Sequence, residues 1–217
     1  MRKYEVVLFD LDGTLTASGE GITKSVQYAL NKMGKEEMGK DLKALEVFIG
    51  PPLLKQFMAF CDITEDEAEL AVKYYRERYT VTGIFENHPY PGIENALQTL
   101  KAQGHRLFVA TSKPEVMANK VLEHFGLAEF FEQVVGATLD GSRIHKEDVI
   151  TYLLGLTGDV GQTLMVGDTA FDVIGAKAHG ICTIGVSWGY GKVEDMVQAG
   201  AIAIAHTMKE LVSLVNQ

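Results

Sequence analysis

Short apolar runs alternate with amphipathic helical stretches along most of this chain, and the alternation restricts the fold more than any other feature. Strands that alternate with helices usually lie parallel in one sheet covered by helices, so the pattern predicts an α/β fold. The expected strands are Glu5–Phe9, Arg106–Ala110, Gln133–Gly136, Thr163–Val166, Cys182–Val186 and, more weakly, Ile202–Ala205. The expected helices are Glu94–Gln103, Pro114–Phe125, Lys146–Gly155, Ala170–His179, Val193–Ala199 and Met208–Val215.

One long segment after the first expected strand breaks the alternation. It has no convincing strand, and its apolar residues Ile22, Val26 and Leu30 recur at helical spacing. Thr64 begins a capping box, which indicates a further helix start. The expected domains are an all-helical insertion, 17–87, and a core that combines 1–16 and 88–217.

Two features of this insertion carry functional expectations. Gly19 and Gly21 lie where the chain enters it, and we expect them to belong to a linker that acts as a hinge. The loop that begins at Gly50 and runs to Lys55 is the expected place for substrate selection. The alternative for that loop is a helix start with a solvated lysine, because Pro51-Pro52 suits the first turn of a helix.

Composition excludes several classes of protein. The chain has 217 residues, 47% of them hydrophobic, which is enough for a sizeable core. Its formal net charge is −9, so no overall basic surface is available for a nucleic-acid polymer, and a small substrate is expected. No apolar run approaches the ~18 residues of a membrane span. Cys61 and Cys182 are far apart and suggest reduced thiols, which favours the cytoplasm.

Polar residues follow several of the expected strands. Asp10 and Asp12 follow the first strand, Thr111 and Ser112 the second, and Asp168 the fourth. Ligands of open α/β sheets bind at the carboxyl ends of the strands, so these side chains should converge on one site.

Convergence would crowd the carboxylates of Asp10, Asp12, Asp168 and Asp172, which is costly unless cations neutralise them. Magnesium fits such a cluster because it prefers oxygen ligands. Lys146 adds positive charge at the expected start of a helix, where the helix dipole disfavours a cation. A nearby anion should compensate it, and a ligand phosphate is one candidate.

Each of these residues also has a structural alternative. Asp12-Gly13 is a common turn dipeptide, and Thr111-Ser112 can cap a helix. The alternatives for the other three are a surface lysine for Lys146, with Arg143 as its nearest rival, an N-cap for Asp168 and a solvated acid for Asp172.

The same residues match, in order and in kind, four motifs of a known superfamily. Asp10-Leu11-Asp12-Gly13-Thr14-Leu15 resembles the first motif, Thr111-Ser112 the second, Lys146 the third and Gly167-Asp168-Thr169-Ala170-Phe171-Asp172 the fourth. Over nearly its whole length the chain resembles the haloacid dehalogenase-like superfamily, in the branch that contains phosphoglycolate phosphatases. The resemblance implies a Rossmann-like core with a helical cap that closes over the site.

The resemblance also implies roles for individual residues. Asp10 would be the nucleophile and form an aspartyl-phosphate, and Asp12 would protonate the leaving group and later activate water. Mg²⁺ would be bound by Asp10, the main-chain carbonyl of Asp12 and Asp168. Thr111, the Ser112 amide and Lys146 would hold phosphate oxygens. Asp172 would orient Lys146 or a water on the metal.

The expected reaction is hydrolysis of a small phosphorylated metabolite. Phosphoglycolate leads on resemblance, and a 5′-nucleotidase is the alternative. A phosphomutase, a dehalogenase and a non-catalytic binding protein are less favoured, the last because no motif residue is lost. Related sequences often carry an acidic residue where this chain has Ala17, which leaves open how the first linker is held. The sequence leaves monomer and homodimer open.

Overall fold

The computed structural model describes residues 4–157 and 162–217, and the chain divides into two compact units. The core unit comprises Met1–Ala17 and Pro89–Gln217. The helical unit comprises Ser18–His88 and is inserted between the first two strands of the core.

The core unit is built on one parallel sheet of six strands, so the expected α/β class is confirmed. The strands are β1 (Val6–Phe9), β2 (Arg106–Pro114), β3 (Gln133–Ala137), β4 (Thr163–Gly167), β5 (Cys182–Val186) and β6 (Ala203–Ala205). Their spatial order is β3-β2-β1-β4-β5-β6. The chain therefore winds outward from β1 in one direction and then, from β4, in the other.

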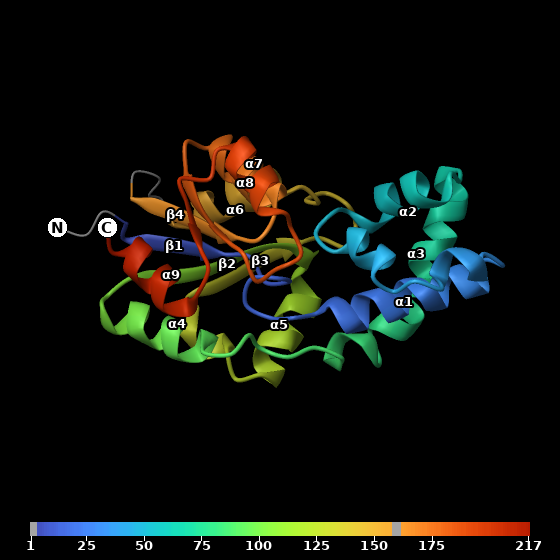
Figure 1. The fold of residues 1–217 in the computed structure, drawn as a ribbon, viewed down its shortest axis with the longest axis horizontal. Helices are drawn as coiled ribbons and strands as arrows, with labels where there is room; N and C mark the ends of the chain where they lie inside the picture. The colour runs from blue at the N-terminus through green and yellow to red at the C-terminus, as the bar shows by residue number, and fades with distance from the viewer. Residues whose placement is uncertain (1–3, 158–161) are drawn as a thin grey trace. The chain divides into compact units, whose positions relative to one another are not determined.

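Helices cover both faces of this sheet (Figure 1). The core helices are α4 (Ile93–Ala102), α5 (Glu115–His124), α6 (Lys146–Thr157), α7 (Ala170–Lys177), α8 (Val193–Ala199) and α9 (Met208–Val215). Helices α4, α5 and α9 lie on one face of the sheet, and α6, α7 and α8 lie on the other. Right-handed crossovers require this change of face, because the order of the strands reverses direction after β3. Among the residues the structure describes, no helix is long and apolar enough to cross a membrane.

Burial on both faces explains why the central strands are continuous apolar runs. All four residues of β1 are buried, and Leu8 packs with Phe108 of β2 and Met165 of β4. Ile150 of α6 closes the same cluster from one face. The sheet is therefore closely packed at β1, the strand that leads into Asp10.

Strand β2 runs to Pro114, past the expected end at Ala110. Ala110 pairs with Val135 and Pro114 pairs with Ala137, so four steps along β2 match two along β3 and the strand bulges. Pro114 has extended backbone with ψ of 128°, and α5 begins one residue later. The expectation that Pro114 occupies the first helical position is therefore wrong, because it still pairs in the sheet.

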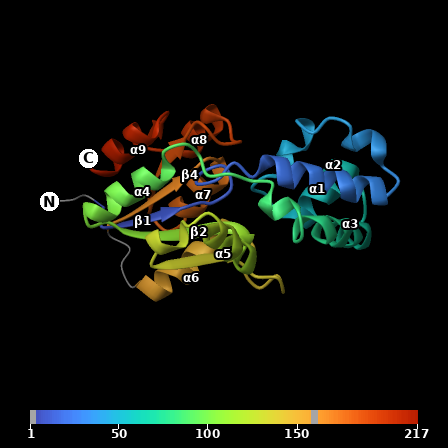
Figure 2. The ribbon, with the colours of Figure 1, turned by 90° about the horizontal axis from the view of Figure 1, so that it is seen from below.

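The helical unit contains no strand in residues 18–88, all of which the structure describes (Figure 2). Its α-helices are α1 (Gly19–Lys32), α2 (Leu53–Cys61) and α3 (Glu65–Tyr79), with short 3₁₀ turns at η1 (Glu36–Gly39), η2 (Ala44–Phe48) and η3 (Gly83–Phe85). Helix α1 packs along α3. Thr64 caps α3 with the reciprocal Glu67 contacts of a capping box, which bears out the sequence signal.

The two glycines expected to form a hinge lie inside the first turn of α1. The Gly21 amide donates to the Glu86 carbonyl at 3.0 Å, and a Cβ on Gly21 would lie 1.8 Å from the Gly83 carbonyl oxygen. Gly21 therefore serves close backbone packing within the helical unit. The hinge expectation is wrong for Gly19 and Gly21, because both are held in a helix.

We expect Gly21→Ala to destabilise the protein by roughly 1–3 kcal/mol, because the added methyl group overlaps the Gly83 main chain. Gly155→Ala is the matched control, since Gly155 is also helical and a Cβ there meets nothing within 4 Å. The control should be neutral or stabilise by about 0.5–1 kcal/mol. Urea unfolding followed by circular dichroism measures both, and equal effects would contradict the packing argument.

Candidate active site

Three buried carboxylates meet where β1 and β4 end, at the point where the winding of the sheet changes direction. Asp10 follows β1, Asp168 follows β4, and Asp172 lies in the first turn of α7. One oxygen from each lies within 4.8 Å of the others. This is the position at which open α/β sheets bind ligands.

Lys146 holds this cluster together from the first residue of α6. Its Nζ donates to Asp10 Oδ1 at 2.7 Å and to the Ala110 carbonyl at 2.8 Å, and it lies 2.8 Å from Asp172 Oδ1. The anion that compensates a lysine at this helix start is therefore supplied by Asp10 and Asp172 of the protein itself.

Burial and charge together shift the protonation of the cluster. Burial raises the pKa of Asp10 to about 6, opposed by Lys146 and assisted by Asp172. Burial, with Asp172 and Asp10, holds the pKa of Asp168 well above its ordinary range. Burial alone would lower the pKa of Lys146, but Asp10 and Asp172 raise it above its usual value. The lysine is thus charged, while the carboxylates lack enough positive charge around them.

Main-chain atoms surround Asp168. The Tyr190 amide donates to its Oδ2 at 2.8 Å. A Cβ on Gly13 would lie 2.1 Å from Oδ2, a Cβ on Gly189 would lie 2.3 Å from the Asp168 Cβ, and a Cβ on Gly191 would lie 2.1 Å from its carbonyl oxygen. Only glycine fits at these three positions.

The other oxygen of Asp168, Oδ1, is fully buried and has no hydrogen-bond partner among the residues the structure describes. An unpaired buried carboxylate oxygen is costly unless a cation binds it. The cluster offers only oxygen donors, and Asp10 stands within reach of Asp168. The residues present therefore fit a divalent metal ion of the hard, oxygen-preferring kind.

Asp172 lies in the first turn of α7, which begins at Ala170, two residues after Asp168. Its Oδ2 accepts from the Thr169 amide and hydroxyl, each at 3.0 Å, and its Oδ1 faces Lys146. Asp172 thus caps α7 and fixes Lys146 at once.

Asp12 lies beside the cluster, and its carboxylate has a partner that the sequence reasoning missed. Lys113 Nζ donates to both Asp12 oxygens, at 2.9 and 2.7 Å. Because both carboxylate oxygens of Asp12 bind Lys113, the main-chain carbonyl is the group of Asp12 that remains to bind a metal. Lys113 stands two residues after Thr111 in the bulge of β2, and the only signal for it was a lysine at the end of an apolar strand.

The remaining predicted residues fall into two groups. Thr111 is buried in the β2 bulge, where its hydroxyl accepts from the Lys113 amide at 3.2 Å, and Ser112 lies beside it. Gly50, with φ of +101°, and the exposed Lys55 of α2 lie in the helical unit. Their roles in binding phosphate and in selecting substrate remain predictions.

Arg143, the rival of Lys146, is engaged elsewhere. Its guanidinium binds Glu115 at 2.7 Å and the Gly136 carbonyl at 2.8 Å, and it stacks on the Tyr152 ring with a centroid distance of 4.1 Å. These contacts hold the loop before α6. Lys146, rather than Arg143, therefore faces the carboxylates.

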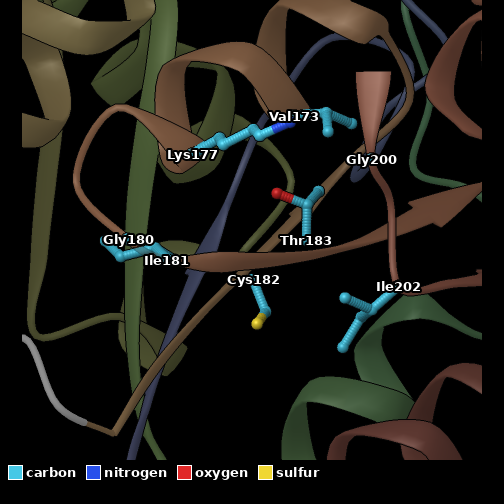
Figure 3. A pocket seen from close by; sticks show the side chains of 8 residues that line it. All are labelled: Val173, Lys177, Gly180, Ile181, Cys182, Thr183, Gly200 and Ile202. Atoms are coloured by element: carbon cyan, nitrogen blue, oxygen red, sulfur yellow. The ribbon is translucent and has the colours of Figure 1, made fainter. Parts of the chain in front are cut away.

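A separate cavity of about 190 Å³ lies at the opposite end of the strands (Figure 3). It is lined by Val173, Lys177, Gly180, Ile181, Cys182, Thr183, Gly200 and Ile202. Cys182 begins β5, so this cavity is at the amino end of the sheet, and the side chains of Cys182 and Thr183 point to opposite sides of the strand. None of the lining residues belongs to the carboxylate cluster.

Most of the chain matches one family of hydrolases. The model of the haloacid dehalogenase-like hydrolase family matches residues 7–186. The chain is similar to the crystal structure of a predicted phosphatase from Clostridium acetobutylicum, with 46% identity, a TM-score of 0.94 and coverage of 98% of each chain. It therefore belongs to the haloacid dehalogenase-like hydrolases.

Relatives with assigned names differ in what those names say. A protein of Pseudomonas aeruginosa named 5′-nucleotidase is 46% identical over 89% of this chain and 87% of its own length. The tyrosine-protein kinase PtkA of Mycobacterium tuberculosis is 40% identical over 95% of this chain and 71% of its own length. A phosphoglycolate phosphatase of Neisseria meningitidis is 30% identical over 91% and 86%.

We expect Mg²⁺ to stabilise the protein more at about pH 7.5 than at about pH 5.5. The pKa of Asp10 is raised from 3.8 to about 6, so its contribution to stability is present in acid and is lost as the pH rises through 6. Above that pH the crowded, ionised carboxylates gain most from a cation. Differential scanning calorimetry with and without Mg²⁺ measures the effect.

Asp168→Asn is the matching variant for this measurement, since it removes the charge of the unpaired oxygen. It should lose most of the Mg²⁺-dependent rise in melting temperature. An equal rise at both pH values, or a full rise in the variant, would contradict a metal site at this cluster.

Proposed function

We propose that this protein hydrolyses small phosphomonoesters through nucleophilic attack by Asp10, and that 5′-nucleotides are preferred to phosphoglycolate. The observation that carries the proposal is the buried Asp10 carboxylate, fixed by Lys146 at 2.7 Å beside the unpaired Oδ1 of Asp168. A turn or a surface cluster gives no reason to bury these groups together. A phosphoryl-transfer site does, because it must hold an attacking carboxylate next to a phosphate dianion.

The substrate preference rests on the relatives. The Pseudomonas aeruginosa protein named 5′-nucleotidase shares 46% of its aligned residues with this chain, whereas the phosphoglycolate phosphatase of Neisseria meningitidis shares 30%. This difference in identity supports 5′-nucleotides, the alternative expected from the sequence, over phosphoglycolate, the substrate that led on resemblance.

Residues of the core unit have separate roles in the proposed reaction. Asp10 attacks phosphorus, the bond between phosphorus and the ester oxygen breaks, and Asp12 gives a proton to the departing alkoxide. A water molecule then attacks the aspartyl-phosphate and gives a proton to Asp12, which releases inorganic phosphate and restores Asp10. Lys146 keeps Asp10 in position, and Thr111 and the Ser112 amide bind phosphoryl oxygens.

Magnesium is the metal we propose for the cluster, and Asp10, Asp168 and the main-chain carbonyl of Asp12 would hold it. When bound, it supplies positive charge that offsets the charge of the phosphoryl oxygens. Asp172 holds Lys146 beside Asp10 through a 2.8 Å contact with its ammonium group. Charge is thereby distributed around the nucleophile before any substrate arrives.

The test is phosphate release from 5′-nucleotides, phosphoglycolate and sugar phosphates, with Mg²⁺ or with EDTA. We expect 5′-nucleotides to rank first, EDTA to abolish release, and Asp10→Asn to lower kcat on the order of 10³-fold or more. Circular dichroism of the variant checks that it is folded. Full activity of Asp10→Asn would overturn the mechanism.

Two further arms separate rival activities. Isomerisation of a sugar phosphate without phosphate release would identify a phosphomutase. Transfer from ATP to a tyrosine-containing peptide, without net hydrolysis of phosphomonoesters, would favour the activity in the name of the PtkA relatives. Either result would contradict the phosphatase proposal.

A further inference from the structure

Lys113 is a buried cation that the proposed mechanism does not use. Only 7% of the residue is exposed, and its ammonium group binds both oxygens of Asp12, at 2.9 and 2.7 Å. The side chain of Asp12 is itself 12% exposed. A buried lysine is rare unless it is paired, so the pair constrains both side chains.

The backbone places Lys113 with little freedom. The bulge of β2 lies between Ala110 and Pro114, where β2 pairs with β3. The Lys113 amide donates to the Thr111 hydroxyl at 3.2 Å, and a Cβ on Gly136 would lie 2.4 Å from the Lys113 carbonyl oxygen. A bulge beside an active site commonly redirects a side chain, and here the redirected ammonium group reaches Asp12.

The two buried lysines of the site have separate partners. Lys146 binds Asp10 and Asp172, while Lys113 binds Asp12. Both oxygens of Asp12 are engaged, so rotation of its carboxylate about the Cβ–Cγ bond would break the pair. The contact therefore fixes the orientation of the one carboxylate that must meet the leaving group.

We propose that Lys113 is a positioning residue that orients Asp12 for proton transfer to the leaving group. This inference rests on the proposed phosphatase function. The step concerned is cleavage of the bond between phosphorus and the ester oxygen. The electron pair of that bond stays on oxygen, which takes the proton that Asp12 carries in the substrate complex, and Asp12 is left as the carboxylate that Lys113 binds. Misplacing the donor should slow this step only for leaving groups that need the proton.

The experiment compares Lys113→Met with the native enzyme on two substrates that differ in leaving group. A 5′-nucleotide releases a basic alkoxide, whereas p-nitrophenyl phosphate releases a phenolate that is stable without protonation. We expect kcat on the nucleotide to fall about 10- to 100-fold. On p-nitrophenyl phosphate it should fall no more than about threefold, because that step needs little help from a general acid.

Three variants sharpen the comparison. Lys113→Arg keeps the charge and should restore part of the activity on the nucleotide. In an Asp12→Ala background, Lys113→Met should add no further loss, because the residue it orients is absent. Lys120→Met, at an exposed lysine of α5, is the control and should match the native enzyme.

Each outcome decides between roles. An equal loss of kcat on both substrates, or a rise in KM with kcat unchanged, would indicate that Lys113 binds phosphate or stabilises the fold. Either result would overturn the inference. Additive losses in the double variant would also overturn it. If the native protein releases no phosphate from either substrate, the proposed function itself has failed, which is a different result. Thermal unfolding of each variant confirms that the folded enzyme is compared.

Discussion

The ammonium group of Lys146 joins three parts of the chain that are far apart in sequence. It binds Asp10 after β1, the Ala110 carbonyl of β2 and Asp172 in α7, all within 2.8 Å. These contacts are buried, so removal of the lysine would leave the carboxylates without their common partner. The position of Asp10, the N-terminal cap of helix α7 and the end of β2 therefore depend on one side chain. In this site the proposed catalytic arrangement and local stability are not separable.

Much of this arrangement follows from the sequence. Apolar runs of β1 and β4 end in Asp10 and Asp168, and parallel strands bring their carboxyl ends to the same edge whatever the side chains are. Lys146 could be placed at the start of a helix from the pattern alone. Convergence of residues from different strands is thus predictable, because topology enforces it.

Details set by local backbone geometry could not be predicted in this way. Periodicity ends β2 at Ala110, but pairing of Pro114 with β3 extends it and creates the bulge that carries Lys113. Gly21 suggested a flexible linker, but it lies in helix α1 and packs closely against the main chain of Gly83. A glycine provides conformational freedom in a turn and allows close backbone packing elsewhere, and the neighbouring backbone determines which of the two applies.

The three glycines around Asp168 have a consequence for how such an enzyme can change. The wall on that side of the carboxylate is built largely from main-chain atoms, so its shape depends little on side-chain identity. Substitutions there would obstruct the carboxylate rather than reshape the space next to it. New substrate preferences must therefore arise in other parts of the molecule, and the chemistry can be inherited unchanged while recognition diverges.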